Sequence, residues 1–225
     1  MKNLKEMIYE TPEMKITCED NMQLMARYPD NYFDLAVVDP PYGLKRLSSK
    51  TDDKNNRFSL KKADKFNNNK PTNQYWNELF RVSRNQIVWG ANNFIMPPSE
   101  YFCIWNKHQT VSNFASAEYA WVSMGLKTPA KVYDYSIHRH NQTKKIHSTQ
   151  KPISLYSWVF KTYAKPNQKI LDTHLGSGSI SLSIHEINDI EKMNLHLTAC
   201  EIDDGFYFDA IQRIKNSTNQ LTIFS

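Results

Sequence analysis

The feature that most constrains the fold is an abrupt break after a short apolar run. The run from Phe33 to Val38 is short and rich in β-branched residues, which is typical of a buried strand. It is followed directly by Asp39-Pro40-Pro41-Tyr42. Two prolines in succession cannot continue the hydrogen bonding of a strand, so the chain must leave the sheet here. Open α/β sheets bind their ligands at the carboxyl ends of strands. The sequence therefore predicts a ligand site at this break.

The groups at the break suit one kind of ligand. Asp39 and the backbone carbonyl of Pro40 are two hydrogen-bond acceptors, and Tyr42 offers an aromatic face. A flat heterocycle with an exocyclic amino group can donate to both acceptors and stack on the ring. Such acceptors would localise the lone pair of the amine and direct it at an electrophile, which requires only positioning and electrostatics. The alternative is an ordinary Pro-Pro turn capped by an aspartate.

Length and composition limit the class of protein. A chain of 225 residues with 40% hydrophobic residues is expected to form a single domain, residues 1–225, with a real core. The scattered cysteines (Cys18, Cys103 and Cys200) predict a reducing compartment without a disulfide framework or zinc site. The N-terminus lacks the apolar core of a signal peptide, and no run is long enough to span a membrane. We therefore expect a soluble protein in the cytoplasm of a bacterium or of a phage-infected cell.

The positive charge is concentrated in one segment. Residues 44–70 contain nine Lys or Arg and three Asp, a net charge of +6, whereas the whole chain has +5. This Asn-, Ser- and Lys-rich segment cannot bury itself and is predicted to be a mobile basic loop. It is either a solvated insertion or, beside a base-binding pocket, a loop that contacts phosphates.

Strand and helix patterns alternate along the chain, which predicts an α/β fold with a doubly wound, mostly parallel sheet. Strands are expected over residues 14–18, 33–38, 86–90, 101–107, 118–123, 169–172 and 195–200. Helices are expected to follow Asp20, to begin at Pro71 and at Pro152, and to cover residues 180–184 and 206–214.

A glycine turn marks a second ligand site. The strand over residues 169–172 runs into Gly176-Ser177-Gly178 and then into a helix, and these glycines let a ligand approach the backbone. Glu201 ends the next strand, where a carboxylate is placed to accept two ribose hydroxyls. A nicotinamide dinucleotide is the alternative ligand for a Gly-x-Gly turn, but the third glycine of that fingerprint is absent.

Three segments together resemble a known family. Asp39-Pro40-Pro41-Tyr42 resembles the Asp-Pro-Pro-Tyr motif of S-adenosylmethionine-dependent amino-methyltransferases that act on DNA. Residues 147–152 resemble the family's His-Pro-Thr-Gln-Lys-Pro segment, with Ser148 in place of a proline. Residues 172–179 resemble its cofactor loop, although Thr173 and His174 stand where Pro and Phe are usual. An Asp at the first motif position is typical of the adenine-N6 enzymes, whereas Ser is more typical of the cytosine-N4 enzymes.

The resemblance implies a fold, a cofactor and a set of roles. The catalytic half comes first in the chain, as in the β group, so the sheet is expected to be a circularly permuted, Rossmann-like methyltransferase sheet that the strand over residues 14–18 completes. The implied cofactor is S-adenosylmethionine, and the implied reaction is methylation of adenine N6 in DNA, with restriction-modification as the biological setting. The implied catalytic residues are Asp39, Pro40, Pro41 and Tyr42. The implied cofactor-binding residues are Asp20, Gln150, Lys151, Pro152, Asp172, His174, Gly176, Ser177, Gly178 and Glu201.

The expected partner is double-stranded DNA from which the target adenine is flipped. Residues 125–147 are a short candidate DNA-recognition segment, and a homodimer is expected because β-group relatives are often dimers. The expected nucleic-acid-binding residues are Lys45, Arg46, Lys61, Lys62, Arg139 and Lys144. His138 and His140 lack accompanying cysteines or carboxylates, so no metal is expected. Two other classes remain open, namely a methyltransferase of RNA or protein and a catalytically silent nucleic-acid-binding module.

Overall fold

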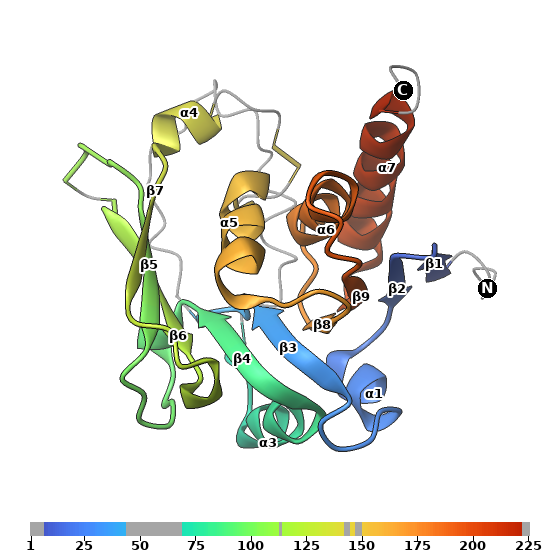
Figure 1. Cartoon of the computed structure of the whole chain (residues 1–225), viewed down its shortest axis with the longest axis horizontal. Helices are drawn as coiled ribbons and strands as arrows, with labels where there is room; N and C mark the ends of the chain where they lie inside the picture. The colour runs from blue at the N-terminus through green and yellow to red at the C-terminus, as the bar shows by residue number, and fades with distance from the viewer. Residues whose placement is uncertain (1–6, 44–68, 113, 142–144, 147–149, 222–225) are drawn as a thin grey trace.

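The computed structural model describes residues 7–43, 69–112, 114–141, 145–146 and 150–221 (Figure 1). Within these residues, nine strands form one sheet in the order β1-β2-β9-β8-β3-β4-β6-β5-β7. The strands are β1 (Ile8–Glu10), β2 (Met14–Cys18), β3 (Phe33–Val38), β4 (Ser83–Trp89), β5 (Phe102–Asn106), β6 (Ala117–Val122), β7 (Lys131–Asp134), β8 (Lys169–Asp172) and β9 (His196–Glu201).

The centre of the sheet is parallel, as the alternating pattern predicts. Strands β2, β9, β8, β3 and β4 pair in parallel in that order. Their carboxyl ends therefore meet at one edge of the sheet. On one side the sheet continues through antiparallel β6 and β5 and then β7, which is parallel to β5. On the other side β1 pairs antiparallel with β2.

The strand over residues 14–18 lies where the permuted order requires it. Met14 is opposite Leu197 and Cys18 is opposite Glu201, so β2 runs parallel to β9 and completes the sheet beyond it. The early strand and the late strands of the chain are therefore direct neighbours (Figure 1). The prediction that the N-terminal strand closes the parallel sheet is confirmed.

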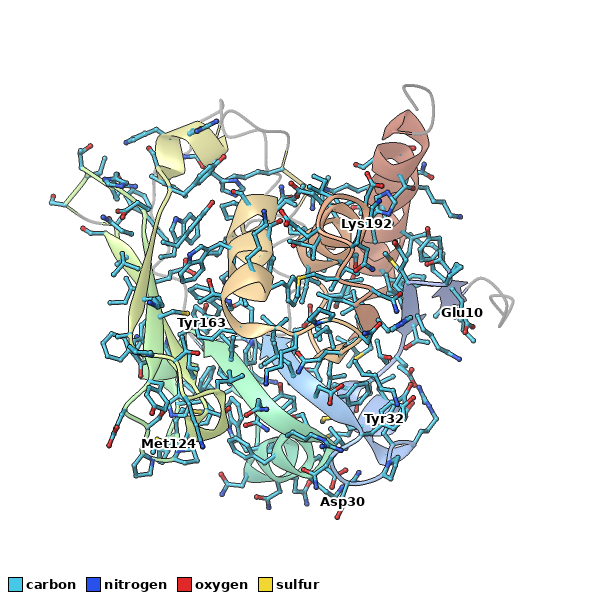
Figure 2. All side chains as sticks on the ribbon, in the orientation of Figure 1. Glu10, Asp30, Tyr32, Met124, Tyr163 and Lys192 are labelled. Carbon is cyan, nitrogen blue, oxygen red and sulfur yellow. The ribbon has the colours of Figure 1, made fainter. Side chains whose placement is uncertain are left out.

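Helices cover both faces, which confirms the doubly wound arrangement. On one face, α1 (Asn21–Ala26) and α3 (Asn73–Val82) bury residues such as Leu24 and Leu79. On the other face lie α5 (Ile153–Tyr163), α6 (Ser179–Ile190) and α7 (Asp204–Leu221). Side chains fill the space between the sheet and both helix layers (Figure 2). Along β3, Leu35 and Val37 belong to one core and Ala36 and Val38 to the other, so the strand is apolar on both faces from Leu35 to Val38.

Helix boundaries follow local signals. Thr72 caps α3 by accepting a hydrogen bond from the backbone N–H of Tyr75 at 3.4 Å. Pro152 occupies the N-cap position of α5. Gly178 precedes α6 with φ +71°, a left-handed conformation that favours glycine. No helix within the described residues is long and apolar enough to cross a membrane.

Two predicted segments are only partly visible. Of the basic loop over residues 44–70, residues 44–68 lie outside the described part of the chain. Within the candidate recognition segment over residues 125–147, the structure contains the end of η3 (Met124–Leu126), the edge strand β7 and the short helix α4 (Ile137–Asn141). The sheet therefore extends into a segment for which the sequence pattern predicts no strand.

Candidate active site at the carboxyl edge of the sheet

Asp39 stands at the carboxyl end of β3, and both oxygens of its carboxylate are engaged. Its Oδ1 accepts a hydrogen bond from the Tyr42 hydroxyl at 2.6 Å, and its Oδ2 contacts the ammonium of Lys151. The Asp39 side chain keeps 17% of its surface exposed. Burial raises the pKa of Tyr42, so its hydroxyl remains a donor. Within the described residues, no hydrogen bond reaches the carbonyl of Pro40.

The position of Tyr42 depends on a glycine in another strand connection. Gly90 follows β4 with φ +64°, and a Cβ placed there would lie 2.1 Å from Cε1 of Tyr42. The ring of Phe94 also contacts Tyr42 edge-on, with ring centroids 6.1 Å apart. Gly90 is therefore needed both for its backbone conformation and for the space that Tyr42 occupies.

Gly90→Ala is expected to displace Tyr42 and to destabilise the fold by about 2 kcal/mol or more, because the new methyl group adds a clash to the cost of a left-handed residue. Thermal denaturation measures this loss. Gly178→Ala is the matched comparison, since its φ is +71° but its nearest contact is the flexible Ile214 Cδ1 at 3.2 Å. An equal loss of stability in both variants would contradict the role of Gly90 in seating Tyr42.

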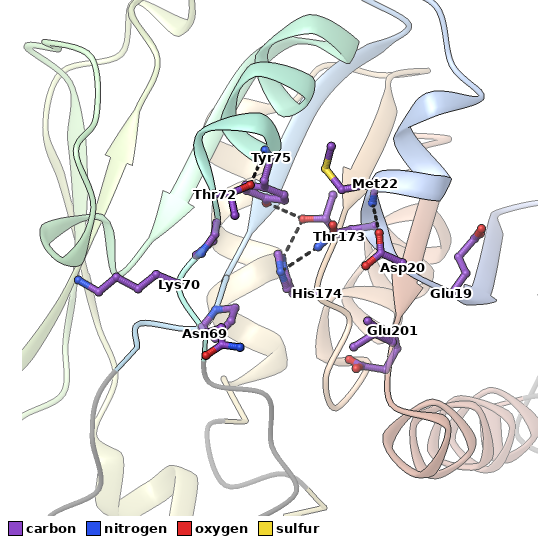
Figure 3. A pocket seen from close by; sticks show the side chains of 14 residues that line it. Glu19, Asp20, Met22, Asn69, Lys70, Thr72, Tyr75, Thr173, His174 and Glu201 are labelled. Atoms are coloured by element: carbon purple, nitrogen blue, oxygen red, sulfur yellow. Dashed lines mark hydrogen bonds between the residues drawn. The ribbon is translucent and has the colours of Figure 1, made fainter.

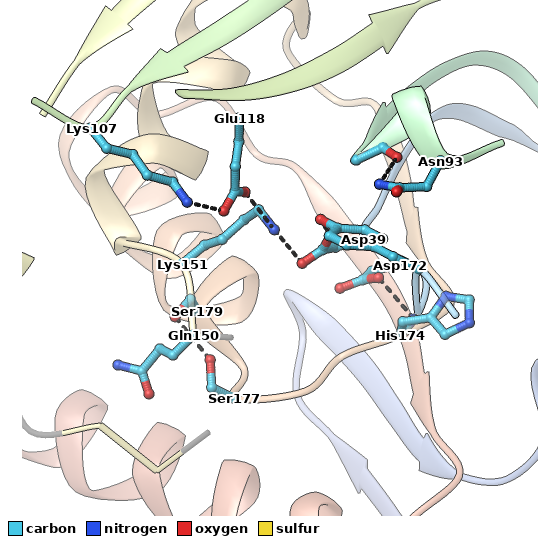
Figure 4. A network of polar contacts seen from close by, with 12 residues as sticks. Asp39, Asn93, Lys107, Glu118, Gln150, Lys151, Asp172, His174, Ser177 and Ser179 are labelled. Carbon is cyan, nitrogen blue, oxygen red and sulfur yellow. Dashed lines mark hydrogen bonds and ion pairs between the residues drawn. The ribbon is translucent and has the colours of Figure 1, made fainter. Parts of the chain in front are cut away.

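A chain of alternating charges extends from Asp39 towards β6 (Figure 4). Lys151 lies between Asp39 and Glu118, and Lys107 binds the far oxygen of Glu118 at 2.5 Å. Burial opposes the charge of Lys151, but the two carboxylates outweigh it and raise the Lys151 pKa. Burial also opposes the charge of Glu118, whose pKa is nevertheless lowered by Lys151 and Lys107. Lys151 and Glu118 therefore both remain charged at neutral pH.

A pocket of about 240 Å³ adjoins this turn (Figure 3). Strand ends contribute Glu19 and Asp20 after β2, Thr173 and His174 after β8, and Glu201 with Ile202 at the end of β9. Pro41, two positions after Asp39, lines the same pocket. The remaining lining residues are Asn21, Met22, Asn69, Lys70, Pro71, Thr72 and Tyr75. Pro41 of the predicted catalytic turn and three predicted cofactor residues, Asp20, His174 and Glu201, thus line one pocket.

Glu201 connects the pocket to the glycine turn. Its two oxygens accept hydrogen bonds from the backbone N–H groups of Gly176 at 2.9 Å and Asp203 at 3.0 Å. Burial raises the pKa of this carboxyl, and the N–H donors counteract part of that rise. Each carboxylate oxygen retains a second lone pair. Glu201 can therefore accept hydroxyl donors from a ligand without giving up its backbone contacts.

His174 is held in the pocket wall by a chain of hydrogen bonds. Its Nε2 lies 3.2 Å from Asn21 Nδ2, and its Nδ1 lies 2.9 Å from the Thr173 hydroxyl, which is 2.7 Å from the Tyr75 hydroxyl. Burial lowers the pKa of the imidazole well below its usual range, so the ring is neutral. An amide N–H of Asn21 directed at Nε2 assigns the ring proton to Nδ1. Thr173 and His174 therefore form a polar pocket wall where the family motif has Pro and Phe.

Asp172 is buried behind this wall, with 3% of its surface exposed. It accepts a hydrogen bond from the backbone N–H of His174 at 3.0 Å. Burial raises its pKa to about 7, and the negative charges of Asp39 and Glu201 add to the rise against the contribution of the His174 N–H. This carboxyl is therefore close to half protonated at neutral pH.

The other expected cofactor residues have structural partners of their own. Asp20 caps α1 by accepting a hydrogen bond from Met22 N at 2.8 Å. Gln150 is buried and accepts a hydrogen bond from Ile146 N at 3.1 Å. The Ser177 carbonyl accepts from Arg213 at 2.7 Å, which ties the glycine turn to α7. The ammonium of Lys151 lies against Asp39, and the pocket lining includes neither Lys151 nor its neighbours Gln150 and Pro152, nor Asp172, Gly176, Ser177 and Gly178.

One of the expected nucleic-acid-binding residues is visible. Arg139 lies on α4, with its guanidinium 5.5 Å from the ring centre of Tyr135. Lys45, Arg46, Lys61, Lys62 and Lys144 lie outside the described residues. His140 is buried and contacts the Gln150 carbonyl at 2.7 Å. Among the residues with described coordinates, no group of three His, Cys, Asp or Glu side chains could hold a metal ion.

Sequence reasoning missed several residues of the site. Glu118 and Lys107 appear in the sequence only as polar ends of apolar strands, and Tyr75 appears only as a core position of a helix. The sequence could have indicated Lys70 and Thr72 as site residues, because they lie where the basic segment ends and the helix beside the pocket begins. No local pattern identifies Glu118 as a partner of Lys151.

Comparison with known proteins finds a related methyltransferase. No family model matches the chain. The chain is 23% identical to the Type II methyltransferase M.HpaI of Haemophilus parainfluenzae over 93% of its own length and 81% of that protein.

Solved structures show the same fold. The PvuII DNA methyltransferase, which is cytosine-N4-specific, matches with a TM-score of 0.55 and 11% identity over 90% of this chain and 86% of that one. The M1.HpyAVI complex with S-adenosylmethionine matches with a TM-score of 0.53 and 15% identity over 89% and 98%. TTHA0409 from Thermus thermophilus, a putative DNA modification methylase complexed with S-adenosyl-L-methionine, matches with a TM-score of 0.53 and 12% identity over 91% and 95%.

These likenesses confirm the expected Rossmann-like methyltransferase fold and the resemblance to the amino-methyltransferases. Two of the neighbours are complexes with the cofactor that the motifs imply. Because one neighbour is cytosine-N4-specific, the likeness does not select a target base.

Proposed function

We propose that this chain, which has the fold of the DNA methyltransferases, transfers a methyl group from S-adenosylmethionine to the N6 amino group of adenine in DNA. The observation that carries the proposal is the shared wall between two sites. Pro41 lines the pocket at the ends of β2, β8 and β9, and Asp39 stands two residues away at the end of β3. A group bound in the pocket and an amine bound at Asp39 would therefore be adjacent.

The residues of the pocket fit an adenosyl group. Drug-sized ligands usually occupy roughly 300–1,000 Å³, so the described pocket of about 240 Å³ matches a nucleoside-sized part of the cofactor. Glu201 has lone pairs for the ribose hydroxyls, and Asp20 offers an acceptor for the adenine amine. When bound, S-adenosylmethionine supplies an electrophilic methyl group. Asp172 and the turn at Gly176 and Gly178 are assigned to its methionine end.

The chain's own residues prepare the nucleophile. Asp39 and the Pro40 carbonyl accept the two amino hydrogens of the target base, which localises the nitrogen lone pair. Tyr42 stacks on the base, and its hydroxyl orients Asp39 through the 2.6 Å hydrogen bond. This arrangement stabilises the positive charge that develops on the nitrogen, and it requires no covalent enzyme intermediate. The N–CH3 bond would form as the S–CH3 bond breaks, S-adenosylhomocysteine would leave, and the nitrogen would lose one proton during or after the transfer.

Two features favour adenine in DNA over other targets. The aspartate at position 39 is typical of adenine-N6 enzymes of the family, whereas a serine is more typical of cytosine-N4 enzymes. The basic residues that follow Tyr42 are placed in the sequence to contact phosphates next to the base pocket. Flipping of the target base and a homodimer are further parts of the proposal.

The first test is transfer of labelled methyl groups from S-adenosylmethionine to unmethylated genomic DNA, followed by mass spectrometry of the nucleosides. N6-methyladenine is the expected product. N4-methylcytosine would retain a DNA methyltransferase but overturn the target base. Product on RNA or protein alone would support the rival methyltransferase class, and failure to bind the cofactor in calorimetry would favour a silent binding module.

Glu201→Gln is expected to weaken binding of S-adenosylhomocysteine about 10- to 100-fold, because an amide provides one acceptor fewer and turns a donor towards the N–H of Gly176 or Asp203. Titration calorimetry measures the change. Glu10→Gln is the control, since that side chain is 61% exposed and pairs with Lys15 at the surface. Unchanged affinity in Glu201→Gln would remove this carboxylate from the cofactor site.

A further inference from the structure

The charge chain next to the proposed base site contains one carboxylate oxygen that depends on Lys151. Glu118 Oε2 is buried and forms an ion pair with Lys151 Nζ at 3.2 Å, and among the described residues no other donor bonds it. Its other oxygen is bound by Lys107 at 2.5 Å. A buried carboxylate oxygen with spare acceptor capacity is costly, so its retention calls for an explanation.

Lys151 lies between two competing acceptors. Its ammonium is 4% exposed, donates to Asp39 Oδ2 and faces Glu118 Oε2, as Figure 4 shows. The ring of Trp89 limits its movement, with its centre 5.7 Å from Nζ. Lys151 can therefore change its hydrogen bond from one carboxylate to the other without moving across open space.

A target amine would compete with Lys151 for Asp39, because the ammonium draws charge from the carboxylate even though each oxygen retains a second lone pair. In the structure Oδ1 of Asp39 is taken by Tyr42 and Oδ2 by Lys151. We infer that Glu118 is a positioning residue that takes over the Lys151 ammonium when the target amino group binds Asp39, and so sets the availability of Asp39. Lys151 remains protonated on either carboxylate, and only hydrogen bonds are exchanged. This inference rests on the proposed function.

Transfer of the Lys151 hydrogen bond from Asp39 to Glu118 predicts a specific defect in Glu118→Gln. Without the second carboxylate, Lys151 stays on Asp39 and competes with the target amine. The probe is an unmethylated DNA duplex that contains the sequence methylated by the unsubstituted protein, with 2-aminopurine next to the target adenine. Flipping of the adenine is measured as a rise in 2-aminopurine fluorescence in the presence of sinefungin, an unreactive analogue of S-adenosylmethionine. We expect the flipped fraction to fall at least fivefold and kcat/KM for DNA to fall 10-fold or more. Affinity for sinefungin and total DNA affinity should change less than twofold.

Two further variants test whether Glu118 acts by accepting the Lys151 hydrogen bond or only supports the fold. In Lys107→Met, both oxygens of Glu118 are left for Lys151, so flipping should be at least as strong as in the unsubstituted protein. In Lys151→Met, the additional change Glu118→Gln should have less than a twofold effect on flipping. Glu191→Gln is the control, because Glu191 pairs with Lys161 at the surface. Thermal denaturation verifies that each variant is folded.

Three results would overturn the inference. These are normal flipping in Glu118→Gln, an equal loss of flipping in Lys107→Met, and an effect of Glu118→Gln that persists when Lys151 is absent. A folding failure of Glu118→Gln leaves the Lys107→Met comparison in force. The proposed function fails separately, if the unsubstituted protein transfers no methyl group to DNA.

Discussion

Asp39→Ala is expected to lose nearly all methyl transfer, with a fall of about 10²–10³-fold in kcat, while the cofactor affinity changes less than threefold. Asp39 supplies one of the two acceptors proposed to activate the amine, and removing a group that stabilises developing charge typically costs about 10²–10³-fold. The pocket that Asp20, His174 and Glu201 line does not include the Asp39 side chain. Catalysis and cofactor binding should therefore separate in this variant.

The measurement combines single-turnover methyl transfer with calorimetry of S-adenosylhomocysteine binding. Lys151 keeps a counter-ion in the variant, because Glu118 Oε2 lies 3.2 Å from its ammonium, so the fold is expected to survive. Asp34→Asn is the matched control, since Asp34 lies at the amino end of β3, far from the carboxyl ends of the strands that form the site. A folded Asp39→Ala protein that no longer binds the cofactor would contradict this division of roles.

Asp172→Asn is expected to bind the cofactor at least 10-fold more weakly and yet to be more stable at pH 8. Asp172 is proposed to accept a hydrogen bond from the amino group at the methionine end of the cofactor. A hydrogen bond to a charged group is worth about 1.5–3 kcal/mol. Burial, with the charges of Asp39 and Glu201, raises the pKa of Asp172 from 3.8 to about 7. The folded protein therefore binds a proton that the unfolded chain has already lost.

The sign of the pH dependence follows from this raised pKa. The carboxyl contributes its full stability below pH 4, and that stability is lost progressively as the pH rises through about 7. Removing the charge should therefore increase stability on the order of 3 kcal/mol at pH 8, or about 6–12 °C in Tm, and much less near pH 4.5. The same ionisation should strengthen cofactor binding by the unsubstituted protein between pH 6 and pH 8.

Thermal denaturation at several pH values and calorimetry with S-adenosylhomocysteine measure the two effects. Asp189→Asn is the control, because that side chain is 66% exposed and faces Lys192 at the surface. If the Tm difference between Asp172→Asn and the unsubstituted protein does not grow with pH, the pKa of Asp172 in the folded protein is not raised. Unchanged cofactor affinity would remove Asp172 from the methionine site.

Some features of the site were predictable because they depend on local chemistry. The Pro-Pro break after Phe33–Val38 ends a strand wherever that strand lies, and Gly178 begins a helix from a left-handed conformation. The place of the N-terminal strand was also predictable, because the family resemblance implies a permuted sheet in which that strand lies beyond β9. The structure confirms these expectations.

Other features were beyond any local pattern. The sequence suggested that Lys151 belongs with the cofactor residues around it, but its ammonium lies against Asp39, 112 positions earlier in the chain. Tyr75 reads as a core position of a helix, yet its hydroxyl reaches Thr173 in the pocket wall. These pairings depend on how α3 and α5 approach the sheet, which is set by packing over the whole core.

The sequence by itself determined the alternation of strands and helices, the break at Asp39, the glycine turn and the chemistry that these groups favour, because each depends on backbone conformation and residue type. Only the tertiary structure decided that both oxygens of Asp39 have partners, that Glu118 pairs with Lys151, and that burial raises the pKa of Asp172 to about 7. Hydrogen-bond partners, burial and electrostatic coupling are set by distances between segments that are remote in the chain, and the order of residues does not contain those distances explicitly.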